Sequence, residues 1–269
     1  MSKLEPGESQ SGDHTVFIIH FLLNATIVAV ELALVAATGW LAWHNAVYFA
    51  GVSMLLAFVI GLNLEIKRLA FEMPFYFART SRLGQIARAL MGSGHAVLKA
   101  LAAGLVALTI FSGTEPQRLQ MVAGIFALCV LAGSILLRRL TISFGARPAR
   151  WGFFRMGVPL GILFSAAMSF FPPPSSLDVA RKVLIDLPGR PGIAQAGEAL
   201  FSLRLWIDDL IRRLLSGVIG PTWAEIAGII IGNMLAGFLI AVFAVTVSEV
   251  VRIMEETHWR MRGLPVTQP

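Results

Sequence analysis

Cysteine and charged residues are both scarce in this chain. Among its 269 residues there is one cysteine, Cys129, and only 14% of the residues are charged. A single cysteine excludes an intramolecular disulfide and a metal site built from several cysteines. Hydrophobic residues make up 56% of the chain, which is more than water-soluble globular domains contain. We therefore expect an integral membrane protein of the all-α class.

Motifs of catalysis and of phosphate or metal binding are also missing. The sequence has no His-Glu-x-x-His, Cys-x-x-Cys or Gly-x-x-x-x-Gly-Lys pattern and no Asp-rich metal cluster. We expect no cofactor, no metal and no enzymatic activity. A membrane lipid-processing enzyme with its chemistry at His44, Asp178 or Asp186 is only the third hypothesis, because no pattern motivates it.

Long apolar runs are what the sequence has instead, and about twenty apolar residues are enough for a helix to cross a bilayer. Six runs approach this length, so we predict a six-span helical bundle. They are residues 16–43, 46–64, 90–112, 119–137, 154–171 and 223–250. The fifth run contains Pro159 and ends at three prolines. A re-entrant segment there, which would leave five spans, is the alternative.

Lys and Arg concentrate in two connections, residues 64–89 and 138–155, whereas Trp43-His44-Asn45 has none. The positive-inside rule places these two loops, and with six spans both termini, in the cytoplasm. In a bacterium the membrane would be the plasma (inner) membrane. The net charge of +6 then indicates anionic lipid headgroups, not nucleic acid, as the partner. The expected headgroup contacts are Arg79, Arg82, Arg138, Arg139, Arg147 and Arg150.

This topology divides the chain into four parts. Residues 1–15 form a cytoplasmic tail, residues 16–171 hold five spans, residues 172–222 form a helical loop on the outer face, and residues 223–269 contain the last span and a cytoplasmic extension. No proline follows Trp223 before Met261, so the pattern allows one helix of about 60 Å, twice the hydrocarbon thickness. A tail that frays after the span is the alternative.

The outer loop divides into two predicted helices, at residues 175–187 and 194–216. The second has a polar stripe that includes two ion pairs at a spacing of four, and its remaining circumference is apolar. Such a helix would lie flat on the outer leaflet or cover the bundle. Because charged stripes are usually solvated, a membrane-lying connector is favoured over a gating or docking element.

Three polar residues interrupt the first apolar run. His20, Asn24 and Glu31 follow one another at spacings of four and seven, so a helix places them on one face. The third run contains His95 and Lys99, one turn apart. Because a charge at the bilayer centre costs about 2.5–3.5 kcal/mol on insertion scales, we predict that Glu31 pairs with Lys99.

The same polar residues also suggest two functional hypotheses. Glu31, His20 and His95 would form a proton or cation path, since burial and neighbours move the pKa values of such groups into the working range. Alternatively, Lys99 or a protonated histidine would receive an anion.

The last run contains a glycine pair that predicts close helix packing. Gly228 and Gly232 are four residues apart, and Asn233 can hydrogen-bond across such a contact, either within the chain or with a second copy. Gly157 and Gly161 are a weaker match, because Pro159 lies between them and distorts the helix.

The leading hypothesis is a non-enzymatic multi-pass subunit of a membrane assembly, which is either a transport complex or an oligomeric channel. The packing glycines, the outer helix and the absence of an internal repeat favour it. Its partners would be other membrane subunits or copies of the same chain. The alternative is a stand-alone proton or cation channel or transporter that uses the face formed by His20, Glu31, His95 and Lys99.

Overall fold

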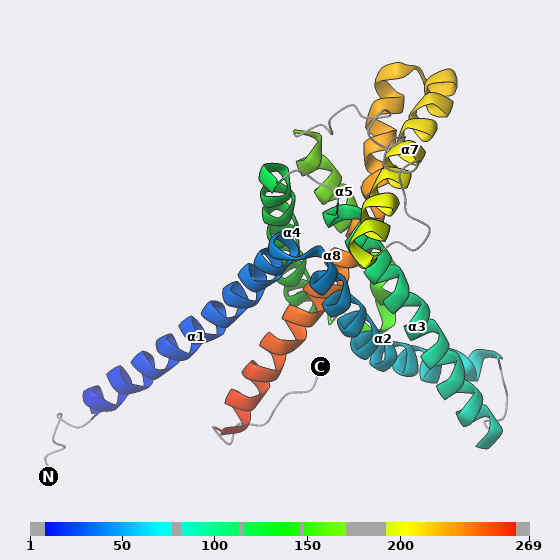
Figure 1. Ribbon diagram of the computed structural model, residues 1–269. Coiled ribbons are helices and arrows are strands. Elements are labelled where there is room, and N and C mark those ends of the chain that lie inside the picture. Colours follow the sequence, from blue (N-terminus) through cyan, green and yellow to red (C-terminus); the bar gives the residue numbers. More distant parts are fainter. Residues whose placement is uncertain (1–8, 77–81, 113–115, 146–147, 171–191, 262–269) are drawn as a thin grey trace, which may run out of the picture.

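The computed structural model describes residues 9–76, 82–112, 116–145, 148–170 and 192–261, and the regular structure in these ranges is entirely helical (Figure 1). The predicted all-α class is therefore confirmed for this part of the chain. The helices are α1 (Ser9–His44), α2 (Ala46–Tyr76), α3 (Arg82–Phe111), α4 (Pro116–Phe144), α5 (Pro148–Ser169), α7 (Ile193–Ile219) and α8 (Pro221–Met261).

Five of the described helices, α1 to α4 and α8, are long and apolar enough to cross a membrane. Their number and hydropathy fit an integral, multi-pass membrane protein. The apolar part of α5 is shorter and runs from Met156 to Ser169. The predicted fifth span at 154–171 is therefore not among the helices of full spanning length.

Several helices extend past the predicted ends of their spans. α2 continues to Tyr76 and α4 to Phe144, so much of each predicted basic loop is helical. α8 is one helix as far as Met261, and at about 1.5 Å per residue its 41 residues measure about 60 Å. The helix predicted at residues 175–187 lies outside the described part of the chain.

An aromatic cluster holds the centre of the bundle together. Phe49 of α2, Phe111 of α3, Phe126 of α4 and Phe243 of α8 are all buried. The ring of Phe49 is stacked on that of Phe243 with the centroids 5.2 Å apart, and it meets Phe111 edge-on at 4.9 Å. Such geometries add to the stabilisation from burial alone. The four residues join helices that are distant in sequence into one core.

Glycines allow α5 and α8 to cross at very short range. A Cβ atom added to Gly237 of α8 would lie 2.0 Å from the carbonyl oxygen of Gly157 and 2.5 Å from the amide nitrogen of Gly161. Gly157 and Gly161, expected to be the weaker packing pair because of Pro159, therefore do form a close helix contact. Helix α5 continues through Pro159, and its two glycines remain on the face that contacts α8.

The bundle is compact in the middle and open at its two ends (Figure 1). The first half of α1 and the last part of α8 diverge at the lower end of the view, where the α2–α3 pair also extends away. At the opposite end, α7 and the first part of α8 form a hairpin that projects beyond the other helices. This hairpin turns at Gly220, whose φ of 82° is favourable for glycine.

Candidate functional site

The first buried carboxylate, Glu31 of α1, is bound by two side chains of α4. Glu31 is only 4% exposed. Ser134 Oγ donates to Glu31 Oε1 at 2.7 Å, and Arg138 Nη1 donates to Oε2 at 2.9 Å. The other end of the guanidinium, Nη2, donates to Glu255 of α8 at 2.9 Å. Both oxygens of Glu31 are therefore occupied, and one arginine links three helices.

The second buried carboxylate is Glu65, near the end of the apolar part of α2, which is only 3% exposed. Lys99 Nζ of α3 donates to Glu65 Oε1. Two more exposed groups approach the same carboxylate: Arg68 Nη1 lies 3.8 Å from Oε1, and His95 Nδ1 lies 3.9 Å from Oε2. Three basic residues thus surround one buried acid between α2 and α3.

These contacts correct the predicted pair of Glu31 with Lys99. Each group has a different partner, because α1 packs against α4 and α3 packs against α2. At the α1–α4 contact, a Cβ atom on Gly39 would lie 3.0 Å from Ala127 Cβ. At the α2–α3 contact, Gly104 lies against the side chain of Met54. The charged side chains pair across these two contacts, so the single polar face predicted for α1 and α3 becomes two separate clusters.

The polar residues that precede Glu31 do not all share its surroundings. Asn24 is exposed, because the first half of α1 leaves the bundle (Figure 1). His20 belongs to α1, but its side chain is outside the described part of the structure. The predicted polar face of α1 is therefore buried at Glu31 and exposed at Asn24.

The arginines expected at lipid headgroups differ in their surroundings. Arg138 contacts two carboxylates, as described above, whereas its neighbour Arg139 is exposed. Arg82 and Arg150 belong to the first turns of α3 and α5, but their side chains are not described. Arg79 and Arg147 lie outside the described residues. The headgroup contacts therefore remain a prediction.

Asn233 and Gly228, one of the two predicted packing glycines, meet α7 of the same chain. Arg204 Nη2 of α7 donates to Asn233 Oδ1 at 2.8 Å, and its Nη1 donates to the carbonyl of Thr109 in α3 at 3.3 Å. Gly228 lies against the aliphatic part of Arg212, where an added Cβ would be 2.5 Å from Cγ. The surroundings of Gly232 are not described. A third polar cluster, centred on Arg204, thus links three helices at the end of the bundle opposite Arg138.

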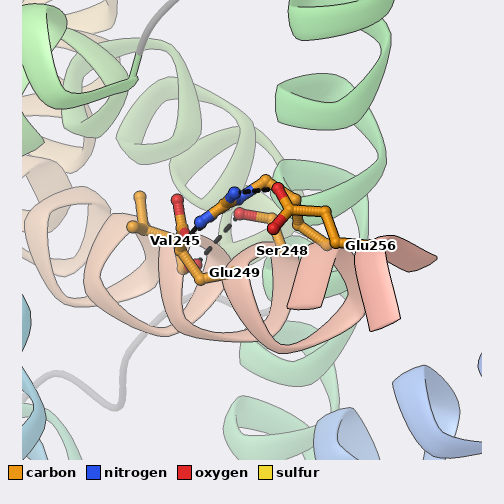
Figure 2. Close-up of polar contacts among 5 residues, drawn as sticks. Val245, Ser248, Glu249 and Glu256 are labelled. Carbon is orange, nitrogen blue, oxygen red and sulfur yellow. Dashed lines mark hydrogen bonds and ion pairs between the residues drawn. The ribbon is translucent and has the colours of Figure 1, made fainter. Parts of the chain in front are cut away.

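A further set of ion pairs runs along the last turns of α8. Arg252 pairs with Glu249 at 2.7 Å and with Glu256, which lie in adjacent turns of the helix. Figure 2 shows the two carboxylates and the hydrogen bond from Ser248 Oγ to the carbonyl of Val245, 2.9 Å long. These pairs are within one helix and partly exposed, so they stabilise it only modestly.

The sequence interpretation missed Ser134, Arg138 and Glu65 as members of the buried clusters. The sequence did contain a signal for Ser134 and Arg138. They are four residues apart, and the next proline after them is Pro148, so a helix that includes both is not interrupted. Glu65 was placed in the basic connection 64–89 because the apolar run ends at residue 64. For Arg204, no pattern in the sequence distinguishes it from the exposed charges of the same helix.

Within the described residues, no group of three or more His, Cys, Asp or Glu side chains is placed to hold a metal ion. No protein-family model, curated protein or solved structure matches the chain. The arrangement of the residues themselves therefore carries the functional argument. The chemistry of the two buried carboxylates is ionic pairing between helices, with each acid neutralised by a base on its neighbour.

Proposed function

We propose that this chain is a non-enzymatic, multi-pass subunit of a membrane assembly, anchored by its paired helices and joined to partners through α1. The observation that carries the proposal is the exposure of α1. Among the five apolar helices long enough to cross a membrane, α1 buries the smallest share of its span. Its first half leaves the bundle (Figure 1) with Phe21, Leu22 and the amide of Asn24 uncovered.

The amide of Asn24 is the reason to expect a protein partner on this surface. Lipid acyl chains cover apolar side chains well but give an amide no hydrogen bond. A second membrane helix does both, since Asn side chains commonly hydrogen-bond across helix contacts in membranes. The partner that fits this surface is an apolar helix with a polar group at the level of Asn24, from another subunit or another copy of the chain.

The proposal includes a topology in which the chain crosses the membrane six times. The first turns of α1 and the last turns of α8 extend toward the same side in Figure 1, and five crossings would leave them on opposite faces. Helix α5 supplies the missing crossing: its 22 residues measure about 33 Å at about 1.5 Å per residue, close to the hydrocarbon thickness. With the basic connections in the cytoplasm, both termini are cytoplasmic.

Replacing Asn24 by Leu tests the partner surface. The substitution keeps α1 apolar but removes the amide, and interhelical hydrogen bonds of this kind contribute about 0.6–1.7 kcal/mol. We expect the apparent association constant with the partner in mild detergent to fall roughly threefold to eighteenfold, and the co-purified fraction to fall with it. The measurement is quantitative co-purification between two differently tagged copies, with mass spectrometry for other subunits.

Asn63→Leu is the matched control. Asn63 is also exposed, but it lies near the charged end of the apolar part of α2, close to Lys67 and Arg68, where water and headgroups satisfy an amide. Its replacement should leave association unchanged. Equal association of the wild type and both variants, or a wild-type protein that is a lone monomer in several mild detergents, would refute the proposal.

A further inference from the structure

Arg212 of α7 lies directly against the backbone of α8, where Gly228 makes room for it. A Cβ atom added to Gly228 would lie 2.5 Å from Arg212 Cγ and 3.1 Å from its Nε. The aliphatic part of the arginine therefore packs on a position of α8 that has no side chain of its own. Nε is buried and has no hydrogen-bond partner among the described residues. Because a buried donor without a partner is destabilising, this atom indicates that a further group binds here.

The two aspartates of α7 are engaged with other arginines. Asp208 Oδ2 lies 3.7 Å from Arg204 Nε, and Asp209 Oδ2 lies 2.7 Å from Arg213 Nε. Burial raises the pKa of Asp208, while the charges of Arg204 and Arg212 lower it, so both arginines are close to this one carboxylate. The remaining acids of the hairpin are exposed, namely Glu198 and Glu225. The surroundings of Arg212 thus contain a second arginine and one shared aspartate, which favours an anion as its ligand.

Arg212 lies at the level of a membrane interface. Gly228 follows Trp223 by five residues, or about 7.5 Å of helix, and Trp223 is exposed, as tryptophans at the headgroup level are. The uncharged stretch of α8, residues 226–248, measures about 35 Å, slightly more than the hydrocarbon core of a bilayer. Gly228 is near one end of this stretch. Lipid phosphates lie just beyond that end, within reach of a partly exposed arginine side chain.

We propose that Arg212 binds a phosphate group at this interface, either in the headgroup of an anionic phospholipid or as free phosphate. The planar fork of donors in a guanidinium matches two phosphate oxygens, and such charge-assisted hydrogen bonds are among the strongest in proteins. Gly228 positions the fork, because the bare backbone lets the arginine lie flat against α8. The site is on the α7–α8 hairpin and is separate from the surface of α1 around Asn24.

Binding to the purified, delipidated full chain in mild detergent tests this proposal. Phosphatidylglycerol is the lipid probe, and its binding is followed by native mass spectrometry. Sodium phosphate is the free-anion probe, and its binding is followed by the midpoint of thermal unfolding at constant ionic strength. Arg212→Gln should weaken binding of the ligand by roughly tenfold, since hydrogen bonds between charged groups contribute at least that factor.

Two variants control for charge and for position. Arg213→Gln removes the same charge from the neighbouring residue, which is exposed and pairs with Asp209, and should leave binding unchanged. Gly228→Ala keeps every charge, but its new methyl group displaces the aliphatic part of Arg212 and should weaken binding as well. The displaced atoms belong to a flexible side chain, so this variant is expected to fold.

The two probes distinguish the sources of the phosphate. A loss with Arg212→Gln that is confined to phosphatidylglycerol assigns the site to a lipid headgroup, and one confined to sodium phosphate assigns it to the free anion. Equal losses with Arg212→Gln and Arg213→Gln, unchanged binding in Gly228→Ala, or no binding of either probe to the wild type would overturn the proposal. Association through Asn24 is measured separately, so the two proposals fail independently.

Discussion

Replacing Arg138 by Leu is expected to lower the free energy of unfolding by about 3 kcal/mol, toward the lower end of the range for breaking a buried ion pair because Arg138 is partly exposed. The substitution leaves the carboxylate of Glu31 buried with Ser134 as its remaining partner. It also disconnects α4 from α8 at Glu255. In detergent, the midpoint of thermal unfolding should fall by roughly 6–12 °C for a chain of this size.

Two further variants separate this effect from a loss of positive charge. Arg139→Leu removes the adjacent arginine, which is exposed, and should change the midpoint little. The double variant Glu31→Leu with Arg138→Leu should recover most of the loss, since an apolar pair often replaces a buried ion pair without cost. Equal midpoints for the two single arginine variants, or a double variant below Arg138→Leu, would contradict the pairing.

Adding a single methyl group at Gly237 is expected to be as damaging. In Gly237→Ala the new Cβ would lie 2.0 Å from the carbonyl oxygen of Gly157 and 2.5 Å from the amide nitrogen of Gly161. Both atoms belong to the backbone, so no side chain can rotate away and α5 must separate from α8. We expect a loss of about 3 kcal/mol, at the upper end of the usual range for overpacking. The measurement is the midpoint of thermal unfolding in detergent.

Gly51→Ala is the control for this substitution. An added Cβ at Gly51 meets nothing within 4 Å, and alanine is the better helix former by about 1 kcal/mol. This variant should unfold at the same temperature as the wild type or slightly above it. If Gly237→Ala behaves like Gly51→Ala, the close crossing of α5 and α8 is not present in the membrane.

The helices were predictable because their signals are local. Apolar runs of spanning length and the absence of proline between Trp223 and Met261 lie in the sequence itself, and the structure has the corresponding helices. Boundaries were less predictable, because apolar runs end where the charge begins, whereas helices such as α4 continue until the backbone is interrupted. Because of this difference, Arg138 was assigned to a loop, although it belongs to α4 and donates a hydrogen bond to Glu31.

Which charge pairs with which was not predictable, because it depends on the neighbours of each helix. Glu31 and Lys99 were matched on depth alone, but Gly39 directs α1 to α4, and Gly104 directs α3 to α2. Single glycines of this kind select helix neighbours by shape, and many glycines in the sequence have the same local context. The buried partners of Glu31 and Glu65 therefore became visible only when the packing was known.

The most direct test of the proposed assembly is photo-crosslinking from α1 in intact membranes. Phe21 is exposed one turn before Asn24, and its exposure leaves room for the larger side chain of p-benzoylphenylalanine, which replaces it. Irradiation should give a discrete adduct of the chain with a second polypeptide, and the adduct should weaken with Asn24→Leu. The same probe at Leu98, exposed on α3, is the control for random collisions. Adducts to lipid alone from position 21 would contradict the account.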